Sequence, residues 1–558
     1  MSSSQPSSRS LLSTSLASAS SLVLLQLFSR IFTFALNQAL VRLVSPQVFG
    51  TAAIQFELLL STILFLSREG VRNALLRANT RNGAKDESDD NGKFKSKKSK
   101  SSTQVIQEED TKTQTLIRNI SLLPILLSIP ITLLTTFLYT SSISSSTRSQ
   151  PHFTLSVLIY ALAAFFELLS EPLYIRAQNE LRFDVRVRAE GTAVVIKTVV
   201  TFVVLVAGGE RWALLAFASG QLGYGIVLLG AFARVYGGLE VWPRKVVDEV
   251  HGNKKTRYFE PQLLQLSAAM TGQSVVKHFL TEGDKFLVSR LSPLADQGGY
   301  AIASNYGSLV ARIVFQPIEE TSRVFFSKTL SSSSTNDPSS LQTASNILTT
   351  LLLLFNHLLL LLATFAPPYL PLAITILLPP RYHATSAPSI LQTYVYYIPM
   401  MAFNGVLEAF FASTATPSDL RVQSRWMLIL SLGFVGAAYL FSQVFELGDA
   451  GLVWANIANL FLRAMYAWMF IKKFFATRGG EDLVLWRKTL PPVQVLLAFV
   501  VSGVVTRLSQ KAYVAKPLTI PAQIPHVAVG VACLAGCLGA CILFERQHLR
   551  QISVLRKR

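Results

Sequence analysis

The chain has 558 residues, of which 50% are hydrophobic and 15% charged, and its formal net charge is +19. A soluble protein of this length would carry roughly 25% charged residues, so the composition predicts a membrane protein. The positive charge would also fit a nucleic-acid-binding protein, but the bases alternate between successive polar loops, which excludes nucleic acid as a partner.

Long apolar stretches recur along the whole sequence. A helix needs roughly 20 mostly apolar residues to cross the bilayer core, and fourteen stretches approach this requirement. We therefore predict an all-α polytopic membrane protein with about fourteen transmembrane helices, of which the seventh and eighth carry several charges. The predicted helices lie near 18–42, 47–70, 116–140, 153–173, 189–207, 211–234, 262–289, 299–325, 341–365, 386–414, 424–443, 449–471, 490–508 and 524–544.

The distribution of Lys and Arg predicts the orientation. If the N-terminus is cytosolic, the cytosolic segments hold 37 of the 51 Lys and Arg residues, the opposite loops hold eight, and six lie inside predicted helices. Loops on the cytosolic side of membrane proteins are enriched in these residues. The pattern therefore indicates an even number of helices with both termini in the cytosol.

Polar segments divide the chain into lobes. We predict an N-terminal lobe with six helices over 1–235, a cytosolic linker over 236–261, a C-terminal lobe with six helices over 262–472, and two further helices with a cytosolic C-terminus over 473–558. Two six-helix halves of equal orientation are typical of transporters. The insert 78–113 contains KDESDDNGKFKSKKSKSS, whose composition predicts a disordered cytosolic loop.

Charged residues inside the predicted helices suggest a polar interior, because lipid penalises them. Arg30 lies near the middle of the first helix. On the eighth helix, Arg312, Glu319, Glu320 and Arg323 are expected to share one face directed between the lobes, and Pro317 predicts a kink. Such charges could line a transport cavity or form ion pairs that fix helix packing, and the sequence leaves both readings open.

Two sets of residues in the predicted helices or at their ends are candidates for such a cavity. The candidate cations are Arg30, Arg68, Arg72, Lys277, Lys285, Arg312 and Arg463. The candidate pairing or gating groups are Glu69, Glu282, Asp284, Glu319, Glu320, Arg323, Asn404 and Glu408.

Motifs of enzymes and metal sites are missing from the sequence. There is no GxxxxGK[ST] loop for ATP and no HExxH zinc motif. The three cysteines, Cys533, Cys537 and Cys541, follow one another at intervals of four residues and lack the spacing of a metal site or a disulfide framework. We therefore predict no enzymatic activity, no cofactor and no metal.

Several segments resemble the Rft family of oligosaccharide translocation proteins, and the resemblance covers essentially the whole chain. The run GSLVAR–FQPIEE is the most specific of them. The chain departs from the family mainly in the insert around 84–112 and in a Ser-rich stretch at 331–340. The other matching segments are LLQLFSRIFTFALNQALVRLVSPQVFG, FLSREGVRNALLR, FLTEGDKFLVSRL and YYIPMMAFNGVLEAFFAS.

The resemblance implies a fold and a function. It implies membership of the multidrug/oligosaccharidyl-lipid/polysaccharide flippase superfamily, with twelve core helices in two lobes plus two more. It also implies that the chain resides in the endoplasmic reticulum membrane. There it would move dolichol diphosphate carrying five mannoses and two N-acetylglucosamines from the cytosolic to the luminal leaflet, for protein N-glycosylation. A non-transporting accessory or scaffold role, with enzymes of that pathway as partners, is the alternative.

On this reading, the candidate cations would meet the diphosphate, which arginine binds through bidentate charge-assisted hydrogen bonds. Arg30 is the leading candidate, because no acidic residue lies within one helical turn of it in the sequence. Without a P-loop, transport would be passive, pulled by consumption of the glycolipid in the lumen, or coupled to an ion.

The fourteen-helix topology makes a testable prediction. Single cysteines placed at Lys95, Arg381 and Leu555, in a chain whose three natural cysteines are replaced, should be labelled from the cytosol at 95 and 555 and from the lumen at 381. Labelling of positions 95 and 381 from the same side of the membrane would contradict this topology.

Overall fold

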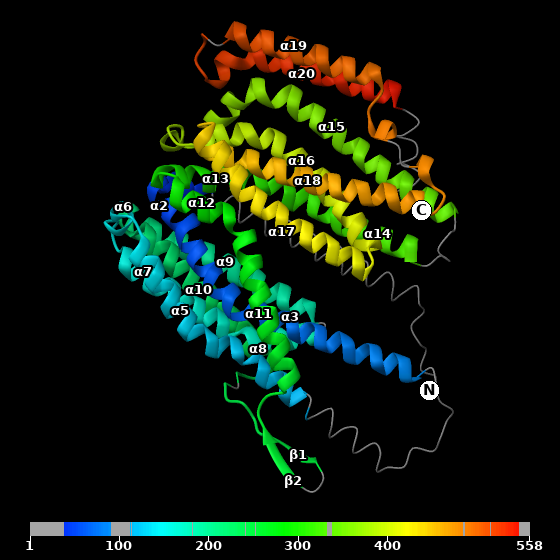
Figure 1. The fold of residues 1–558 in the computed structure, drawn as a ribbon. Helices are drawn as coiled ribbons and strands as arrows, with labels where there is room; N and C mark the ends of the chain where they lie inside the picture. The colour runs from blue at the N-terminus through cyan, green and yellow to red at the C-terminus, as the bar shows by residue number, and fades with distance from the viewer. Residues whose placement is uncertain are drawn as a thin grey trace, which may run out of the picture. The chain divides into compact units, whose positions relative to one another are not determined.

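The computed structural model describes residues 38–545 except 91–111, 113, 181, 240, 251–252, 332–337, 484–485 and 514. The described chain is almost entirely helical, and it divides into two compact units, Met1–Leu294 and Ala295–Arg558. Figure 1 shows their helices and the single hairpin. The predicted lobe boundaries and the orientation of the termini stay predictions.

Within the described residues, ten helices are long and apolar enough to cross a membrane, and all ten coincide with helices that the sequence predicts. The prediction of an all-α polytopic membrane protein is thereby confirmed. The segments predicted at 262–289, 299–325 and 449–471 are also helical, but they do not meet the same criterion of length and apolarity. The first predicted helix, 18–42, lies mostly outside the described residues, so the total of fourteen stays a prediction.

The first unit is built from long helices that cross the unit and short helices that connect them. Phe232 of α10 and Leu75 of α3 are buried in its core, together with Ile120 and Ala193. Its elements are α2 (Pro46–Gly50), η1 (Thr51–Phe56), α3 (Glu57–Asp90), α5 (Leu123–Ser142), α6 (Ser145–Arg148), α7 (Phe153–Leu169), α8 (Glu171–Asn179), α9 (Phe183–Gly208), η2 (Glu210–Trp212), α10 (Ala213–Tyr236), β1 (Val246–Val250), β2 (Asn253–Arg257), α11 (Pro261–Thr281) and α12 (Gly283–Leu291).

The second unit has an aromatic core in which the rings of Phe326, Phe410 and Phe475 are fully buried and in contact. Helices α19 and α20 lie side by side, and α19 packs against α15 (Figure 1). Its elements are α13 (Leu294–Val310), η3 (Ala311–Phe315), α14 (Gln316–Ser331), α15 (Pro338–Leu377), η4 (Pro380–Tyr382), α16 (Ala387–Thr414), α17 (Pro417–Tyr439), η5 (Leu440–Val444), α18 (Gly448–Ala476), η6 (Glu481–Leu483), η7 (Trp486–Thr489), α19 (Val493–Tyr513) and α20 (Ile520–Phe544).

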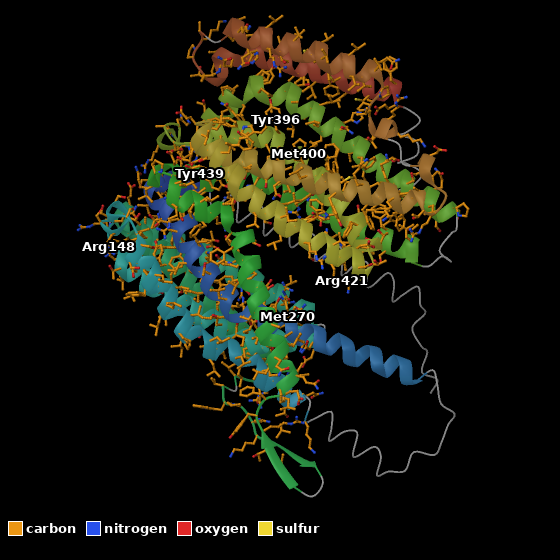
Figure 2. All side chains as sticks on the ribbon, in the orientation of Figure 1. Arg148, Met270, Tyr396, Met400, Arg421 and Tyr439 are labelled. Carbon is orange, nitrogen blue, oxygen red and sulfur yellow. The ribbon has the colours of Figure 1, made fainter. Side chains whose placement is uncertain are left out.

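The outer surfaces of the helices are apolar, as a bilayer requires. On α17, whose ends are marked by Arg421 and Tyr439 in Figure 2, the side chains of Ile429 and Leu432 are 57% and 66% exposed. A soluble protein rarely exposes contiguous apolar patches of this kind. Arg421 lies near one end of α17 and Tyr439 at the other. Basic and aromatic residues usually occupy such positions at the two membrane–water interfaces.

A π-helix changes the expected geometry around Pro317. Residues Ala311–Phe315 form η3, directly before α14. A π-helix lengthens the hydrogen-bonded loop by one residue, and proline removes a backbone donor that a regular helix would use. This π-helix interrupts the regular α-helical spacing that we assumed between Arg312 and Glu319. The side chain of Arg312 lies outside the described part of the structure, so the shared polar face stays a prediction.

Two polar segments are more ordered than the sequence suggested. Helix α3 continues to Asp90, so the loop expected from residue 78 begins later; no proline interrupts the helix, and adding residues to an existing helix is easier than starting one. The segment expected as a plain linker over 236–261 contains the antiparallel pair of β1 and β2, in which Val246 lies opposite Arg257. Asn119 holds this segment, because its side-chain amide donates to the carbonyls of Arg244 and Tyr258, both at 2.7 Å.

The close approach of α3 and α11 depends on Gly70. A Cβ atom at this position would lie 2.2 Å from Oγ1 and 2.4 Å from Cα of Thr271. We predict that Gly70→Ala destabilises the protein by about 1–3 kcal/mol, the usual cost of overpacking, measured as a lower melting temperature of the purified protein in detergent. Gly272→Ala on α11 is the matched control, because its Cβ would meet nothing within 4 Å. Equal melting temperatures for the two variants would contradict the close approach.

Candidate functional site

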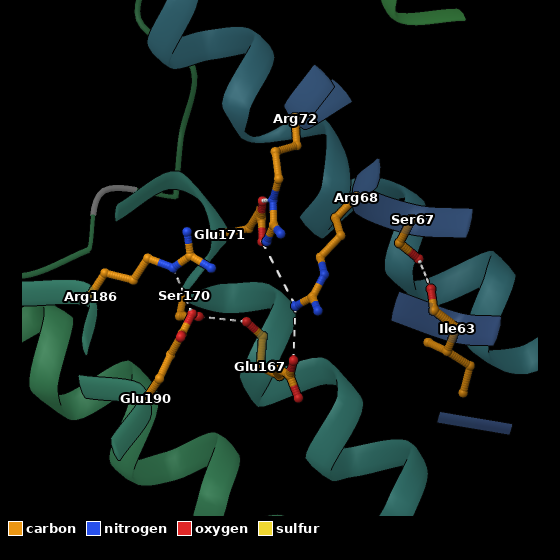
Figure 3. A network of polar contacts seen from close by, with 9 residues as sticks. All are labelled: Ile63, Ser67, Arg68, Arg72, Glu167, Ser170, Glu171, Arg186 and Glu190. Carbon is orange, nitrogen blue, oxygen red and sulfur yellow. Dashed lines mark hydrogen bonds and ion pairs between the residues drawn. The ribbon is translucent and has the colours of Figure 1, made fainter. Parts of the chain in front are cut away.

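Two arginines of α3 face two glutamates at the junction of α7 and α8. Arg68 Nη1 donates to Glu167 Oε1 at 2.8 Å and lies 3.9 Å from Glu171 Oε2. Arg72 binds Glu171 with two parallel hydrogen bonds, from Nε to Oε1 at 2.7 Å and from Nη2 to Oε2 at 2.6 Å. We call these four residues the arginine–glutamate ladder, which Figure 3 shows from close by.

The sequence spacing explains why the ladder forms. The arginines are four residues apart on α3, and the glutamates are four residues apart on the facing segment, so each pair presents its charges on neighbouring turns. The backbone changes helix at Ser170, which ends α7 and precedes α8, and Pro172 occupies the first turn of α8, where its missing N–H is not needed. Glu171 thus stands in the first turn of α8, where a negative charge is favoured.

The ladder is buried more deeply on its acidic side. The side chains of Glu167 and Glu171 are 7% and 2% exposed, against 22% and 18% for Arg68 and Arg72. The guanidinium carbon of Arg72 also lies 4.0 Å from the centre of the Tyr174 ring. A buried carboxylate without its cation would be strongly destabilising, so the ladder fastens α3 to the α7–α8 junction.

The two arginines differ in how many of their N–H donors form hydrogen bonds to the glutamates of the ladder. Arg72 binds Glu171 with two hydrogen bonds from one edge of its guanidinium, formed by Nε and Nη2, and stacks on an aromatic ring, so it is held in one orientation. Arg68 makes a single hydrogen bond to the ladder. A guanidinium has five N–H donors, so Arg68 can bind a further anion while its hydrogen bond to Glu167 stays in place.

The second unit contains a comparable pair between α16 and α18. Arg463 donates to Glu408 Oε1 from Nε at 2.9 Å and from Nη2 at 2.6 Å. Asn404 lies one turn before Glu408 on α16 and is buried, and its Oδ1 has no hydrogen-bond partner among the described residues. Oδ1 of Asn459, one turn before Arg463 on α18, is likewise buried without a described partner.

Other predicted pairing groups bind within their own helices. Arg323 donates to Glu319 at 3.0 Å on α14, and Oε2 of Glu319 lies 3.2 Å from where a side chain would begin at Gly405 of α16. Glu320 is exposed and forms no ion pair with any described residue. At the start of α12, Lys285 pairs with Glu282 at 2.8 Å, and Asp284 Oδ1 accepts a hydrogen bond from the backbone of Lys285.

The remaining predicted residues are placed only in part. Glu69 accepts a hydrogen bond from Asn73 at 3.2 Å. Arg30 lies outside the described residues. Lys277 and Arg312 lie on α11 and η3, but their side chains are outside the part that the structure describes.

The sequence analysis did not include Glu167 and Glu171 among the candidate residues. The signal that could have found their role is the matched four-residue interval on two helices, with opposite charge. Among the described residues, no three His, Cys, Asp or Glu side chains converge as ligands of a metal ion.

Solved structures with the same arrangement of helices define the class of protein. The chain is similar to the lipid II flippase MurJ in an inward closed conformation, with a TM-score of 0.58, 15% sequence identity, and coverage of 95% of this chain and 99% of that chain. It is also similar to an inward-facing multidrug resistance MATE family transporter of the MOP superfamily, with a TM-score of 0.50, 14% identity, and coverage of 80% and 96%. The chain therefore has the fold of the MOP-superfamily membrane transporters.

Comparison of sequences gives the family. The family model described as Rft protein matches residues 14–555, and the chain belongs to the Rft family. Three relatives carry the name Man(5)GlcNAc(2)-PP-dolichol translocation protein RFT1. The protein of Schizosaccharomyces pombe is 34% identical and covers 89% of each chain, and that of Saccharomyces cerevisiae is 31% identical and covers 84% of each. The Xenopus tropicalis protein is 28% identical, over 96% of this chain and 95% of its own.

The burial of the ladder predicts asymmetric effects of mutation. Arg72→Met leaves Glu171 buried without its cation, so it should destabilise the protein by about 3–5 kcal/mol, whereas the double variant Arg72→Met/Glu171→Leu should recover most of the loss. Melting temperatures of the purified proteins in detergent measure both effects.

The exposed pair of Arg176 and Glu180, with side chains 58% and 39% exposed, provides the control. Arg176→Met should change stability by no more than about 1 kcal/mol. A single Arg72→Met variant as stable as Arg176→Met would show that the ladder does not hold α3 in place.

Proposed function

We propose that this chain carries Man(5)GlcNAc(2)-PP-dolichol across the endoplasmic reticulum membrane, from the cytosolic to the luminal leaflet. The observation that carries this proposal is the match to the Rft family over residues 14–555, with relatives that are named as translocation proteins for this glycolipid. The flippase fold supports it, because lipid II flippase MurJ is named for moving a lipid-linked precursor.

The chemistry of the cargo sets what the protein must offer. A diphosphate with a large glycan cannot cross hydrocarbon without polar partners, and a dolichol tail must remain in lipid. The described helices supply polar groups inside apolar spans, including the ladder in the first unit and Arg463 with Glu408 in the second. In this proposal no bond is made or broken, so the protein acts as a carrier and not as an enzyme.

We propose different roles for the cations. Arg68 contacts the diphosphate, because among the described residues only one of its five N–H donors forms a hydrogen bond, and this bond to Glu167 keeps both charges neutralised in the empty state. Arg72 positions α3 and the ladder and does not contact the cargo. Lys285 and Arg463 serve mainly as partners of Glu282 and Glu408.

The cations without described side chains complete the proposed path. Arg30, Lys277 and Arg312 are proposed to meet the diphosphate, with Arg30 nearest to the middle of its helix. Because no ATP-binding loop is present in the sequence, we propose that consumption of the glycolipid in the lumen drives net movement. The alternative is an accessory protein that binds enzymes of the same pathway without moving the glycolipid.

Replacing Arg68 in cells tests the proposed contact. In cells that depend on this chain, Arg68→Met/Glu167→Leu, which removes the buried carboxylate together with its cation, should cause underglycosylation and accumulation of the five-mannose dolichol intermediate, while the protein level stays close to normal. Arg68→Lys should rescue only in part, because a point charge replaces a planar fork of donors. The measurement is the profile of lipid-linked oligosaccharides together with the amount of the membrane protein.

Two further variants separate cargo contact from stability. The double variant Arg72→Met/Glu171→Leu should keep both the protein level and glycosylation, because the pair is proposed to be structural. Normal glycosylation with Arg68→Met/Glu167→Leu at normal level would contradict a cargo contact at Arg68. Disappearance of this double variant would instead assign Arg68 to helix packing.

A further inference from the structure

A small pocket opens in the first unit where α9 begins and α10 ends. Its volume is about 200 Å³. Val185 and Ala189 of α9 are buried and form its apolar floor together with residues of α10. Arg182, Asp184 and Arg188 line it and are exposed. The pocket therefore joins an apolar floor to a rim that carries two cations and one anion.

The neighbouring arginines at this end of the unit are already neutralised. Arg176 donates to Glu180 at 2.8 Å, and Arg186 donates to Glu190 at 3.0 Å, each across four residues of one helix. Each of these two arginines therefore already uses part of its charge and hydrogen-bonding capacity on a glutamate four residues away, before any ligand binds.

The two arginines that line the pocket lack such partners. Four residues after Arg182 comes another arginine, and four residues after Arg188 comes Thr192. In the part of the chain that the structure describes, neither guanidinium has a carboxylate within ion-pair distance. Arg182 is held instead over the ring of Tyr236, with 5.9 Å between the guanidinium carbon and the ring centre. Asp184 lines the same pocket, but it does not form an ion pair with either arginine among the described residues.

An apolar strip leads away from the pocket along α9. Ile196, Val199, Val203 and Val206 follow Thr192 at intervals of three or four residues and are 37%, 40%, 58% and 61% exposed. Residues at this spacing share one face of a helix, and ten residues from 196 to 206 span roughly 15 Å. A ligand with an anionic head in the pocket could therefore lay an apolar tail along the strip.

We propose that this pocket binds the head group of a phosphoglyceride that carries a primary ammonium beside its phosphate, such as phosphatidylethanolamine or phosphatidylserine. Arg182 and Arg188 bind the phosphodiester, because guanidinium groups donate paired hydrogen bonds to phosphate oxygens. Asp184 accepts from the ammonium, and the strip holds an acyl chain. The apolar strip favours a bilayer lipid over a soluble phosphate, and the lipid fastens the start of α9 to the end of α10.

Native mass spectrometry of the purified full-length chain tests this site. Palmitoyl-oleoyl phosphatidylethanolamine is titrated into the protein in detergent, and the bound fraction gives an affinity. Arg182→Ala/Arg188→Ala should weaken binding by about tenfold, and the corresponding double lysine variant should recover part of it. Arg211→Ala is the matched control, because Arg211 lies in η2, which joins the other ends of α9 and α10, and it should bind as the wild type does.

The choice of head group tests the role of Asp184. Wild-type protein should bind phosphatidylethanolamine more tightly than phosphatidylglycerol, which lacks the ammonium, and more tightly than phosphatidylcholine, whose ammonium has no N–H donor. Asp184→Asn should remove the preference over phosphatidylglycerol. All of these residues are exposed, so the variants should have the same melting temperature as the wild type. A loss of binding will then not reflect unfolding.

Several results would overturn the proposal. One is equal binding of all three lipids by the wild type, and another is equal binding of phosphatidylethanolamine by the double alanine variant and by Arg211→Ala. Displacement of the lipid by millimolar inorganic phosphate would also overturn it. Displacement by dolichyl diphosphate at equal concentration would assign the pocket to the transported cargo and would likewise overturn a phosphoglyceride site.

Discussion

An ionised side chain inside a membrane needs a partner, and this requirement governs the polar interior of both units. A centrally placed charge is disfavoured by about 2.5–3.5 kcal/mol on insertion scales. The protein meets this cost by pairing charges across helices. Arg72 and Glu171 form two parallel hydrogen bonds between α3 and α8, and Arg463 and Glu408 join α18 to α16. The packing of each unit therefore depends on contacts that are polar at their centre and apolar around it.

The same requirement distinguishes a structural cation from one that can serve a cargo. Removing Arg72 from its carboxylate would leave two buried charges unpaired, which argues against its use as a transient ligand. Arg68 keeps one bond to Glu167 and has further donors. An arriving diphosphate can add to this arrangement without first breaking it.

Apolar helices were the most predictable part of the structure. The segment expected at 386–414 forms α16 over Ala387–Thr414, and the segment expected at 153–173 begins at Phe153. Burial in lipid selects long apolar runs, which a single sequence displays directly. Helix α18 shows the limit of prediction from apolar runs. It was expected as a membrane helix and is helical over Gly448–Ala476. It does not, however, meet the criterion of length and apolarity that ten other described helices meet.

The polar details were harder to predict, for identifiable reasons. The matched four-residue spacing suggests that Arg68 and Arg72 could pair with Glu167 and Glu171. Several other acidic residues in the sequence could have served as partners equally well. Only the packing of α3 in the folded structure selects these two glutamates. The π-helix at Ala311–Phe315 has no sequence signal except Pro317 shortly after it. The hairpin of β1 and β2 was not expected, because the polar composition of residues 236–261 indicated a plain linker.

Movement of the glycolipid by the purified chain alone tests the central claim most directly. The chain would be reconstituted in liposomes with fluorescent Man(5)GlcNAc(2)-PP-dolichol, and leaflet exchange would be followed with a membrane-impermeant quencher. Our account predicts exchange by the wild type, exchange by Arg72→Met/Glu171→Leu, and a large loss with Arg68→Met/Glu167→Leu in equally stable protein. Absence of exchange by stable wild-type protein, under conditions in which it still binds enzymes of the pathway, would contradict the account and identify an accessory protein.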